Sequence, residues 1–258
     1  MTKATIDSKV VDRKLREAVW PVLKAVGFRR TGRTAWRDRP DAIQVVNIQS
    51  FNAYLADAIG VTTFSFAVNL GVFYPAIARL SAIGSFIKDP TRPAEYVCQA
   101  RLHLVKLHAQ PLEPPSRRLL GLRAAVSPDS RRRDRPDVWY VRPDGSNATE
   151  AAADAGEQIL RVGIPWLEQL ADLPEARRRF QEVISVDAGP DRPSEDYGGG
   201  LGSPNRWLAI GALSVALGDV AGAAWAAEEM GALEYFQERR AELDAVRAAI
   251  DGIRPPPD

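Results

Sequence analysis

The chain has 258 residues, of which 45% are hydrophobic and 26% are charged, and its formal net charge is +1. These values are ordinary for a soluble globular protein, and the length allows one large domain or two small ones. The single cysteine, Cys98, excludes an internal disulfide framework. The longest apolar run covers residues 207–218, whereas a membrane-spanning helix needs about 20 residues. With no signal-peptide pattern at the N-terminus, we expect a cytoplasmic protein without membrane contact.

The charge is distributed unevenly along the chain. Residues 1–145 carry 24 Lys and Arg against 13 Asp and Glu, whereas residues 146–258 carry 10 against 20. Such an asymmetry indicates either an anion-binding surface on the basic side or two halves that neutralise each other. The sequence leaves both interpretations open.

The first part of the chain combines one amphipathic helix with strands. Apolar residues at three- and four-residue steps predict a helix over residues 5–26, kinked or broken at Pro21 and ended by Gly27. Turn residues and alternating side chains then predict further elements. These are strands at 34–37 and 42–51, a loop at 52–60, a strand at 62–72 and a short helix after Pro75.

The remaining chain changes from sheet to helix. After a loop at residues 85–93, we expect a strand over 95–107, an exposed loop at 109–136 and a last short strand at 138–141. Helices are predicted from Asn147 or Thr149 to about residue 162, and at 174–185, 205–217, 220–230 and 232–250.

These elements predict an α+β fold, with a mostly antiparallel sheet of about five strands covered by helices and followed by a C-terminal helical bundle. The Gly- and Pro-rich composition of residues 186–204 predicts a linker. The expected organisation is therefore an α+β domain over 1–185, the linker, and an acidic helical region over 205–258 that packs on the first domain.

A set of spaced residues gives a family resemblance over about residues 10–170. The set comprises Pro21, Leu23, Gly27, Phe28, Thr34, Trp36, Gln49, Val68, Asn69, Leu70, Gly71, Cys98, Arg101 and Trp139. In this pattern the chain resembles the bacterial family catalogued as domain of unknown function 4304. The resemblance implies an α+β domain with a mostly antiparallel sheet, and it implies no particular activity.

The C-terminal region has a second similarity. Residues Trp207, Ile210, Gly211, Gly218, Asp219 and Ala223 resemble the spacing of a tetratricopeptide helix pair, although that pattern expects an aromatic at Ser214 and a proline near Tyr235. A free-standing array of such repeats needs about three of them. We therefore expect a helical hairpin packed on the first domain.

Few residues offer catalytic or metal-binding chemistry. The two histidines, His103 and His108, are five positions apart, so they lie on opposite faces of a strand and share no local metal site. Cys98 stands where a buried strand thiol is expected. The glycines at 198–202 lack the lysine of a phosphate-binding loop. We predict neither a metal nor a cofactor, and the sequence favours binding over catalysis.

Two sets of polar residues are candidate binding sites. If the strands form a meander, seven of them share the non-core sheet face and line a groove, namely Asn47, Gln49, Ser65, Asn69, Gln99, Arg101 and His103. A candidate anion-binding set lies around the first hairpin and in the long loop, namely Arg29, Arg30, Arg33, Arg37, Arg131, Arg132 and Arg133. Solvation or internal pairing of these arginines is the alternative interpretation.

Three functional hypotheses follow from these sets. The leading one is a non-catalytic module, of an inhibitor or immunity type, that binds a protein partner through the polar sheet face or the acidic tail. The second is nucleic-acid binding by the arginines, which predicts affinity that falls with salt. The third is a small-molecule enzyme that uses Gln99, Arg101 and His103 in the groove.

Overall fold

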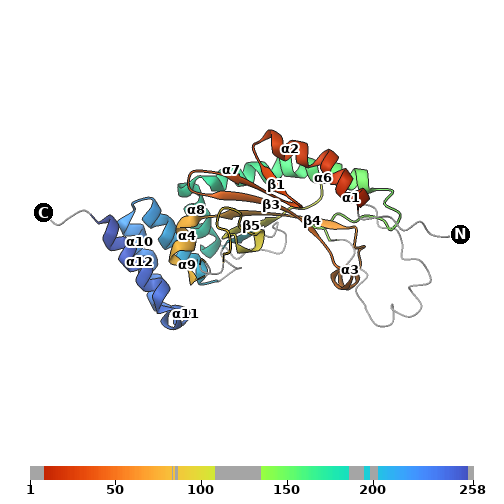
Figure 1. The fold of residues 1–258 in the computed structure, drawn as a ribbon. Coiled ribbons are helices and arrows are strands. Elements are labelled where there is room, and N and C mark those ends of the chain that lie inside the picture. Colours follow the sequence, from red (N-terminus) through yellow and green to blue (C-terminus); the bar gives the residue numbers. More distant parts are fainter. Residues whose placement is uncertain are drawn as a thin grey trace. The chain divides into compact units, whose positions relative to one another are not determined.

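The structure is a computed structural model that describes residues 9–82, 84, 87–107, 135–185, 195–197 and 203–254. The predicted loop 109–136 and linker 186–204 therefore lie largely outside the described residues. The described elements are shown in Figure 1. In chain order they are α1 (Lys9–Ala18), α2 (Trp20–Ala25), β1 (Arg29–Thr31), β2 (Thr34–Asp38), β3 (Ile43–Ser50), α3 (Ala53–Ile59), β4 (Phe66–Phe73), α4 (Pro75–Leu80), the 3-10 helix η2 (Glu95–Val97), β5 (Ala100–His103), α6 (Ala148–Gln158), the π-helix η4 (Ile159–Gly163), α7 (Ile164–Ala171), α8 (Leu173–Ser185), β6 (Glu195–Tyr197), α9 (Asn205–Ala216), α10 (Val220–Ala232), α11 (Glu234–Glu238) and α12 (Arg240–Ile253).

The strands form one sheet in the order β1-β2-β3-β4-β5-β6. The pairs β1–β2, β2–β3, β4–β5 and β5–β6 are antiparallel. With helices before, between and after the strands and four helices at the C-terminal end, the predicted α+β class is confirmed. Strand β1 was missing from the prediction because all three of its residues are exposed, which removes the apolar alternation that marks a strand.

Other local predictions need correction. Residues 62–65 do not extend β4, which begins at Phe66, and the predicted strand at 138–141 is reduced to one bridge between Phe66 and Trp139. The predicted loop 52–60 contains α3, capped by the Asn52 side chain, which accepts from Leu55 N at 2.8 Å, and ended by Gly60 at φ 73°. Only Ala56 of this helix is buried, so its sequence has no amphipathic period.

The described chain divides into two compact units. Unit 1 contains Met1–Phe28, Ile48–Val68 and Leu104–Gly163. In this unit α1 packs on α6, and the prediction of a break at Pro21 is confirmed because Pro21 lies in the first turn of α2. Phe66 and Trp139 exchange backbone hydrogen bonds of 3.1 and 2.8 Å and stack their rings. The Trp139 indole also donates to Asp154 at 2.8 Å.

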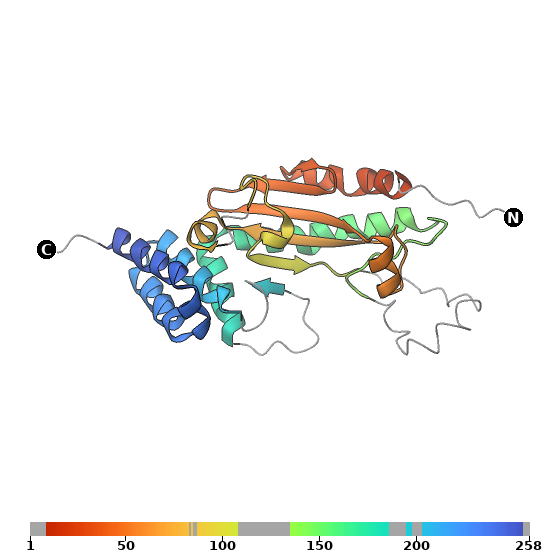
Figure 2. The same ribbon diagram turned by 60° about the horizontal axis from the view of Figure 1, so that its bottom comes forward.

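Unit 2 contains Arg29–Asn47, Asn69–His103 and Ile164–Asp258. Its α9, α10 and α12 lie side by side, and α4 and α8 both contact α9 (Figures 1 and 2). These C-terminal helices have their own apolar core, which includes Met230, Phe236 and Val246 and against which Leu80 of α4 packs. A second apolar cluster joins Val45 of β3, Phe73 of β4 and Cys98.

Within the described ranges, each helix is either too short or too polar to cross a bilayer.

Candidate functional site

One face of the sheet in unit 2 carries polar side chains beside an apolar cluster. Val45 and Phe73 belong to the same cluster, so they mark one face of β3 and β4. Because side chains alternate along a strand, Asn47 and Asn69 lie on that face as well. On β5, His103 is opposite Asn69 and Arg101 is opposite Gly71. Asn47, Asn69, Arg101 and His103 are therefore on one side of the sheet.

His103 is oriented by a buried amide. Its Nδ1 lies 2.7 Å from Asn69 Oδ1, and the Asn69 residue is only 3% exposed. An amide oxygen accepts a hydrogen bond, so the neutral imidazole carries its proton on Nδ1 as the donor and has its lone pair on Nε2. In this tautomer Nε2 can accept a hydrogen bond. The His103 side chain is partly exposed, so a ligand could supply that hydrogen bond.

Arg101 is held by a carboxylate from η2. Its Nε donates to Glu95 Oε1 at 2.7 Å, and the Glu95 side chain is 8% exposed. Gly71, opposite Arg101, makes room for Cys98: a Cβ at Gly71 would lie 2.6 Å from the Cys98 Sγ. Burial, and secondly the Glu95 charge, raises the pKa of the Cys98 thiol, which keeps it protonated at neutral pH.

The other predicted groove residues have structural partners or lie in unit 1. Gln99 Oε1 accepts from Tyr74 N at 2.8 Å, which fixes the chain where β4 ends. Ser65 is fully buried and its Oγ accepts from Val141 N at 3.0 Å. Ser65 and the exposed Gln49 both belong to unit 1. Asn47 donates to Thr34 Oγ1 at 2.9 Å. Whether this face forms a groove stays a prediction.

Two arginines of the first hairpin bind a carboxylate of α7. Arg39 Nη2 lies 2.5 Å from Glu168 Oε1, and Arg37 Nη2 lies 2.7 Å from the same oxygen. Arg37 also donates from Nε to Gln44 Oε1 at 2.6 Å, and Gln44 donates to the carbonyl of Leu167 at 2.6 Å. Burial is the main cause that lowers the pKa of Arg37. These contacts attach α7 to β2 and β3.

The remaining members of the anion-binding set differ in their surroundings. Arg29 is 79% exposed and pairs with Asp38, the last residue of β2. Arg30 donates to the carbonyl of Gly32 at 3.2 Å, and Arg33 occupies the β1–β2 turn. Arg131, Arg132 and Arg133 lie outside the described residues. Anion binding by this set stays a prediction.

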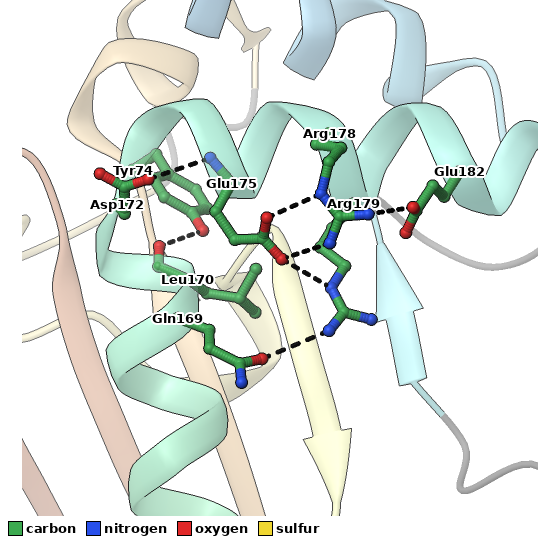
Figure 3. Close-up of polar contacts among 8 residues, drawn as sticks. All are labelled: Tyr74, Gln169, Leu170, Asp172, Glu175, Arg178, Arg179 and Glu182. Carbon is green, nitrogen blue, oxygen red and sulfur yellow. Dashed lines mark hydrogen bonds and ion pairs between the residues drawn. The ribbon is translucent and has the colours of Figure 1, made fainter.

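A second run of arginines, at residues 177–179, forms ion pairs within unit 2. Figure 3 shows Arg178 and Arg179 donating to Glu175, and Arg178 also pairs with Glu182. Hydrogen bonds from Arg178 are the main cause that lowers the pKa of Glu175. Arg177 donates to Asp219 Oδ2 at 2.5 Å, at the start of α10. The Arg177–Asp219 contact ties α8 to the C-terminal helices, whereas the other ion pairs lie within α8.

The same view shows how the end of α7 is joined to α8. Asp172 Oδ2 accepts from Glu175 N at 3.2 Å, which caps the start of α8. Tyr74, which follows β4, donates its hydroxyl to the carbonyl of Leu170 at 2.7 Å (Figure 3). The charged side chains of this corner are thus oriented by one another and by the helix ends.

Sequence reasoning missed Glu95, which contacts Arg101 of the polar face, and the exposed residue that follows it. Glu95 pairs with Arg101, and its neighbour Tyr96 is 75% exposed. The sequence predicted that Glu95 and Tyr96 belong to a strand, whereas they lie in the 3-10 helix η2, which bends the chain here. The run Pro93-Ala94-Glu95 was an available signal for this bend, because a proline shortly before a polar residue favours a turn. No group of three or more His, Cys, Asp or Glu with metal-binding spacing occurs among the described residues.

Comparison with known proteins identifies the family. Residues 19–169 match the family described as domain of unknown function DUF4304. No curated protein and no solved structure matches the chain. The matched segment covers more than half of the chain and includes β3, β4, η2 and β5, which carry the polar face. The chain therefore belongs to the DUF4304 family.

Proposed function

We propose that this protein is a non-catalytic module, of an inhibitor or immunity type, that binds another protein through the sheet face around Tyr96. We call this surface the Tyr96 face and define it by Tyr96 and the partly exposed Asn47, Arg101 and His103, of which the buried Glu95 and Asn69 orient the last two. The observation that carries the proposal is the exposure of Tyr96, which is 75% accessible on an ordered turn.

The backbone around Tyr96 is fixed on both sides. Val97 N donates to the Ala94 carbonyl at 3.1 Å, and Glu95 is held by Arg101. A tyrosine on a fixed backbone has only two side-chain torsions to order when a partner binds. It offers both an apolar ring and a hydroxyl, and for these reasons tyrosine is enriched at protein interfaces.

A protein partner suits the neighbouring side chains better than a nucleic acid does. Trp36, the aromatic residue of the basic hairpin, donates its indole N–H to the Pro93 carbonyl at 2.8 Å and packs on the Val45 cluster. Its ring is thus engaged inside the protein, whereas single-stranded nucleic acids need exposed stacking surfaces. Arg37 and Arg39 are likewise paired with Glu168.

Replacement of Tyr96 tests the proposal. The tagged wild-type protein and its Tyr96→Ala variant would be used to capture partners from an extract of source cells, and binding of the purified partner would then be measured by calorimetry. We expect Tyr96→Ala to weaken binding at least tenfold, about 1.4 kcal/mol. Tyr54→Ala is the matched control, because Tyr54 is 80% exposed and lies in unit 1. Equal binding by all three proteins would contradict the proposal.

A second candidate function is small-molecule chemistry at His103, which the fixed Asn69–His103 pair favours. A bound ligand that uses Nε2 would raise the melting temperature of the wild-type protein in a metabolite screen. His103→Ala should abolish that increase, whereas a variant that keeps the full increase would remove this candidate.

A further inference from the structure

The outer surface of α10 combines small apolar residues with one exposed tryptophan and two glutamates. Its inner side buries Ala223, Ala226, Ala227 and Met230 in the core of the C-terminal helices. Its outer side shows a stripe at helical spacing that we call the α10 surface, made of Ala221, Ala224, Trp225, Glu228, Glu229 and Ala232. Trp225 is the large side chain of this stripe and is 41% exposed.

Trp225 is held in place by a second aromatic residue. The ring of Trp207 from α9 meets it edge-to-face, with the ring centroids 4.9 Å apart, and Trp207 packs on the helical core. Trp225 thus has a supported ring with one part left accessible. Tryptophans in such settings contribute strongly to binding because little conformational freedom remains to be lost.

The charged side chains next to Trp225 on α10 are glutamates. In α10, α11 and α12, the carboxylates with a cation within 4.0 Å are Glu242, Asp244 and Asp251, each paired with an arginine of the same helix or the residue beside it. Glu228 and Glu229 on α10 and Glu234 and Glu238 on α11 have no such ion pair within the described part of the chain. The surface therefore presents an aromatic side chain beside two carboxylates that form no ion pair within 4.0 Å in the described part of the chain.

We propose that the α10 surface binds a basic amphipathic helix of another protein, with an apolar residue against Trp225 and Lys or Arg side chains against Glu228 and Glu229. Charge complementarity selects this partner. Nucleic acid and anionic membranes would be repelled by the glutamates, and a second copy of the same surface would bring like charges together. The inference goes beyond the proposed function, because the α10 surface is separate from the Tyr96 face and lies outside the family match.

A model peptide tests this inference on the full chain. The probe is a fluorescein-labelled helix of about 18 residues, built from Leu and Lys so that one side is apolar and the other basic. We expect micromolar binding by fluorescence anisotropy that weakens as salt rises from about 0.05 to about 0.3 M. Trp225→Ala should weaken it at least tenfold. The double variant Glu228→Gln/Glu229→Gln should weaken it and flatten its salt dependence.

Matched controls separate the site from general attraction. Glu150→Gln removes an exposed carboxylate on α6, and Tyr54→Ala removes an exposed ring, so both should bind the probe like the wild type. Circular dichroism would establish that the variants are folded. The glutamine double variant keeps the side-chain shape, and it therefore tests the site even if Trp225→Ala unfolds the helices.

Several outcomes would overturn the inference. These are absence of binding, equal binding by the variants and the controls, and equal binding of a probe in which Glu replaces Lys. Residues 117–126 of this chain are themselves basic and apolar. Tighter binding of a peptide with that sequence would show that the occupant is a segment of the same chain. A dimer that Trp225→Ala dissociates would show that the occupant is a second copy of the protein. Loss of partner binding in Tyr96→Ala with no binding at the α10 surface would leave the proposed function intact and remove only this inference.

Discussion

At the scale of single residues, the clearest feature is a buried cation that depends on one carboxylate. The Arg37 side chain is 9% exposed, and its charge is balanced by Glu168, whose side chain is 43% exposed. A buried charge that loses its carboxylate partner is costly, because its burial limits solvation by water. Arg37 was predicted as a binding residue, and its contacts give it a structural role as well.

Replacement of Glu168 by Gln should therefore destabilise the protein. We expect the free energy of unfolding to fall by about 2 kcal/mol, below the range for a fully buried pair because water reaches Glu168. Urea denaturation measures the change. Glu157→Gln is the control, since Glu157 and Arg161 form an exposed pair at 3.3 Å and should cost less than about 0.5 kcal/mol. Equal midpoints for the two variants would contradict this role of Glu168.

Asp219 gives a prediction of pH dependence. Hydrogen bonding to Gly222 N, and then to Arg177, lowers the pKa of Asp219 from its ordinary value of 3.8. Since the folded pKa is the lower one, the stabilisation is complete above the unfolded value and disappears as the pH falls through the folded value. Asp219→Asn should cost about 0.5 kcal/mol at pH 7, because asparagine keeps the cap and loses only the charge of a partly exposed carboxylate. The difference from the wild type should shrink below about pH 4, as measured by urea denaturation across pH. A stability difference that stays constant across pH would contradict this role of the Asp219 charge.

At the scale of elements, close approach between β4 and the chain after η2 depends on the absence of a side chain at Gly71. A Cβ there would lie 2.6 Å from the Sγ and 2.7 Å from the Cβ of Cys98. The cluster of Val45, Phe73 and Cys98 is close to this contact, so the clash would displace packed side chains. The position of η2, and with it Tyr96, depends on this fit.

Gly71→Ala should consequently lower the free energy of unfolding by about 2 kcal/mol, the typical cost of overpacking a core. The double variant Gly71→Ala/Cys98→Gly should recover part of the loss, because it removes the opposing side chain. Gly252→Ala serves as control: nothing lies within 4 Å of its added Cβ, and alanine favours the helix. Thermal unfolding would compare these three variants with the wild-type protein. Failure of the double variant to recover any stability would argue against the contact.

At the scale of the whole molecule, the C-terminal helices are attached to the preceding elements of unit 2 by packing and by polar contacts. α9 contacts α4 and α8, and Leu80 packs on the helical core. Glu242 of α12 accepts from Ala82 N at 2.8 Å, and Asp219 binds Arg177. We propose that residues 205–258 form a helical region packed on the domain of residues 1–185, with 186–204 as a linker that contains the edge strand β6.

Cleavage within the linker tests this organisation. A protease site placed between residues 186 and 194 should yield two fragments that elute together in size-exclusion chromatography, because the contacts of α9 and α12 persist without the covalent connection. The same cleaved protein with the substitution Arg177→Ala lacks the contact with Asp219. Its two fragments should therefore separate at a lower urea concentration. Fragments that separate at once in native buffer would contradict the proposal.

The sequence was sufficient for the elements whose own residues carry the signal. Pro21 predicted the break before α2, and the family pattern predicted the α+β class, which the antiparallel sheet confirms. It was insufficient for β1, whose residues are all exposed, and for α3, which buries only Ala56. Both elements are fixed by turns, pairing and caps, and these leave no apolar period in the sequence.

For the candidate site, alternation along the strands sufficed to select Asn69, Arg101 and His103, since the face of a strand residue follows from its position. Only the tertiary structure decided what these residues contact. The turn at η2 brings Glu95 to Arg101, and the packing of α7 on β2 brings the distant Glu168 to Arg37. A sequence determines charge and periodicity, whereas the pairing of distant charges depends on burial and distance, which exist only once the chain has folded.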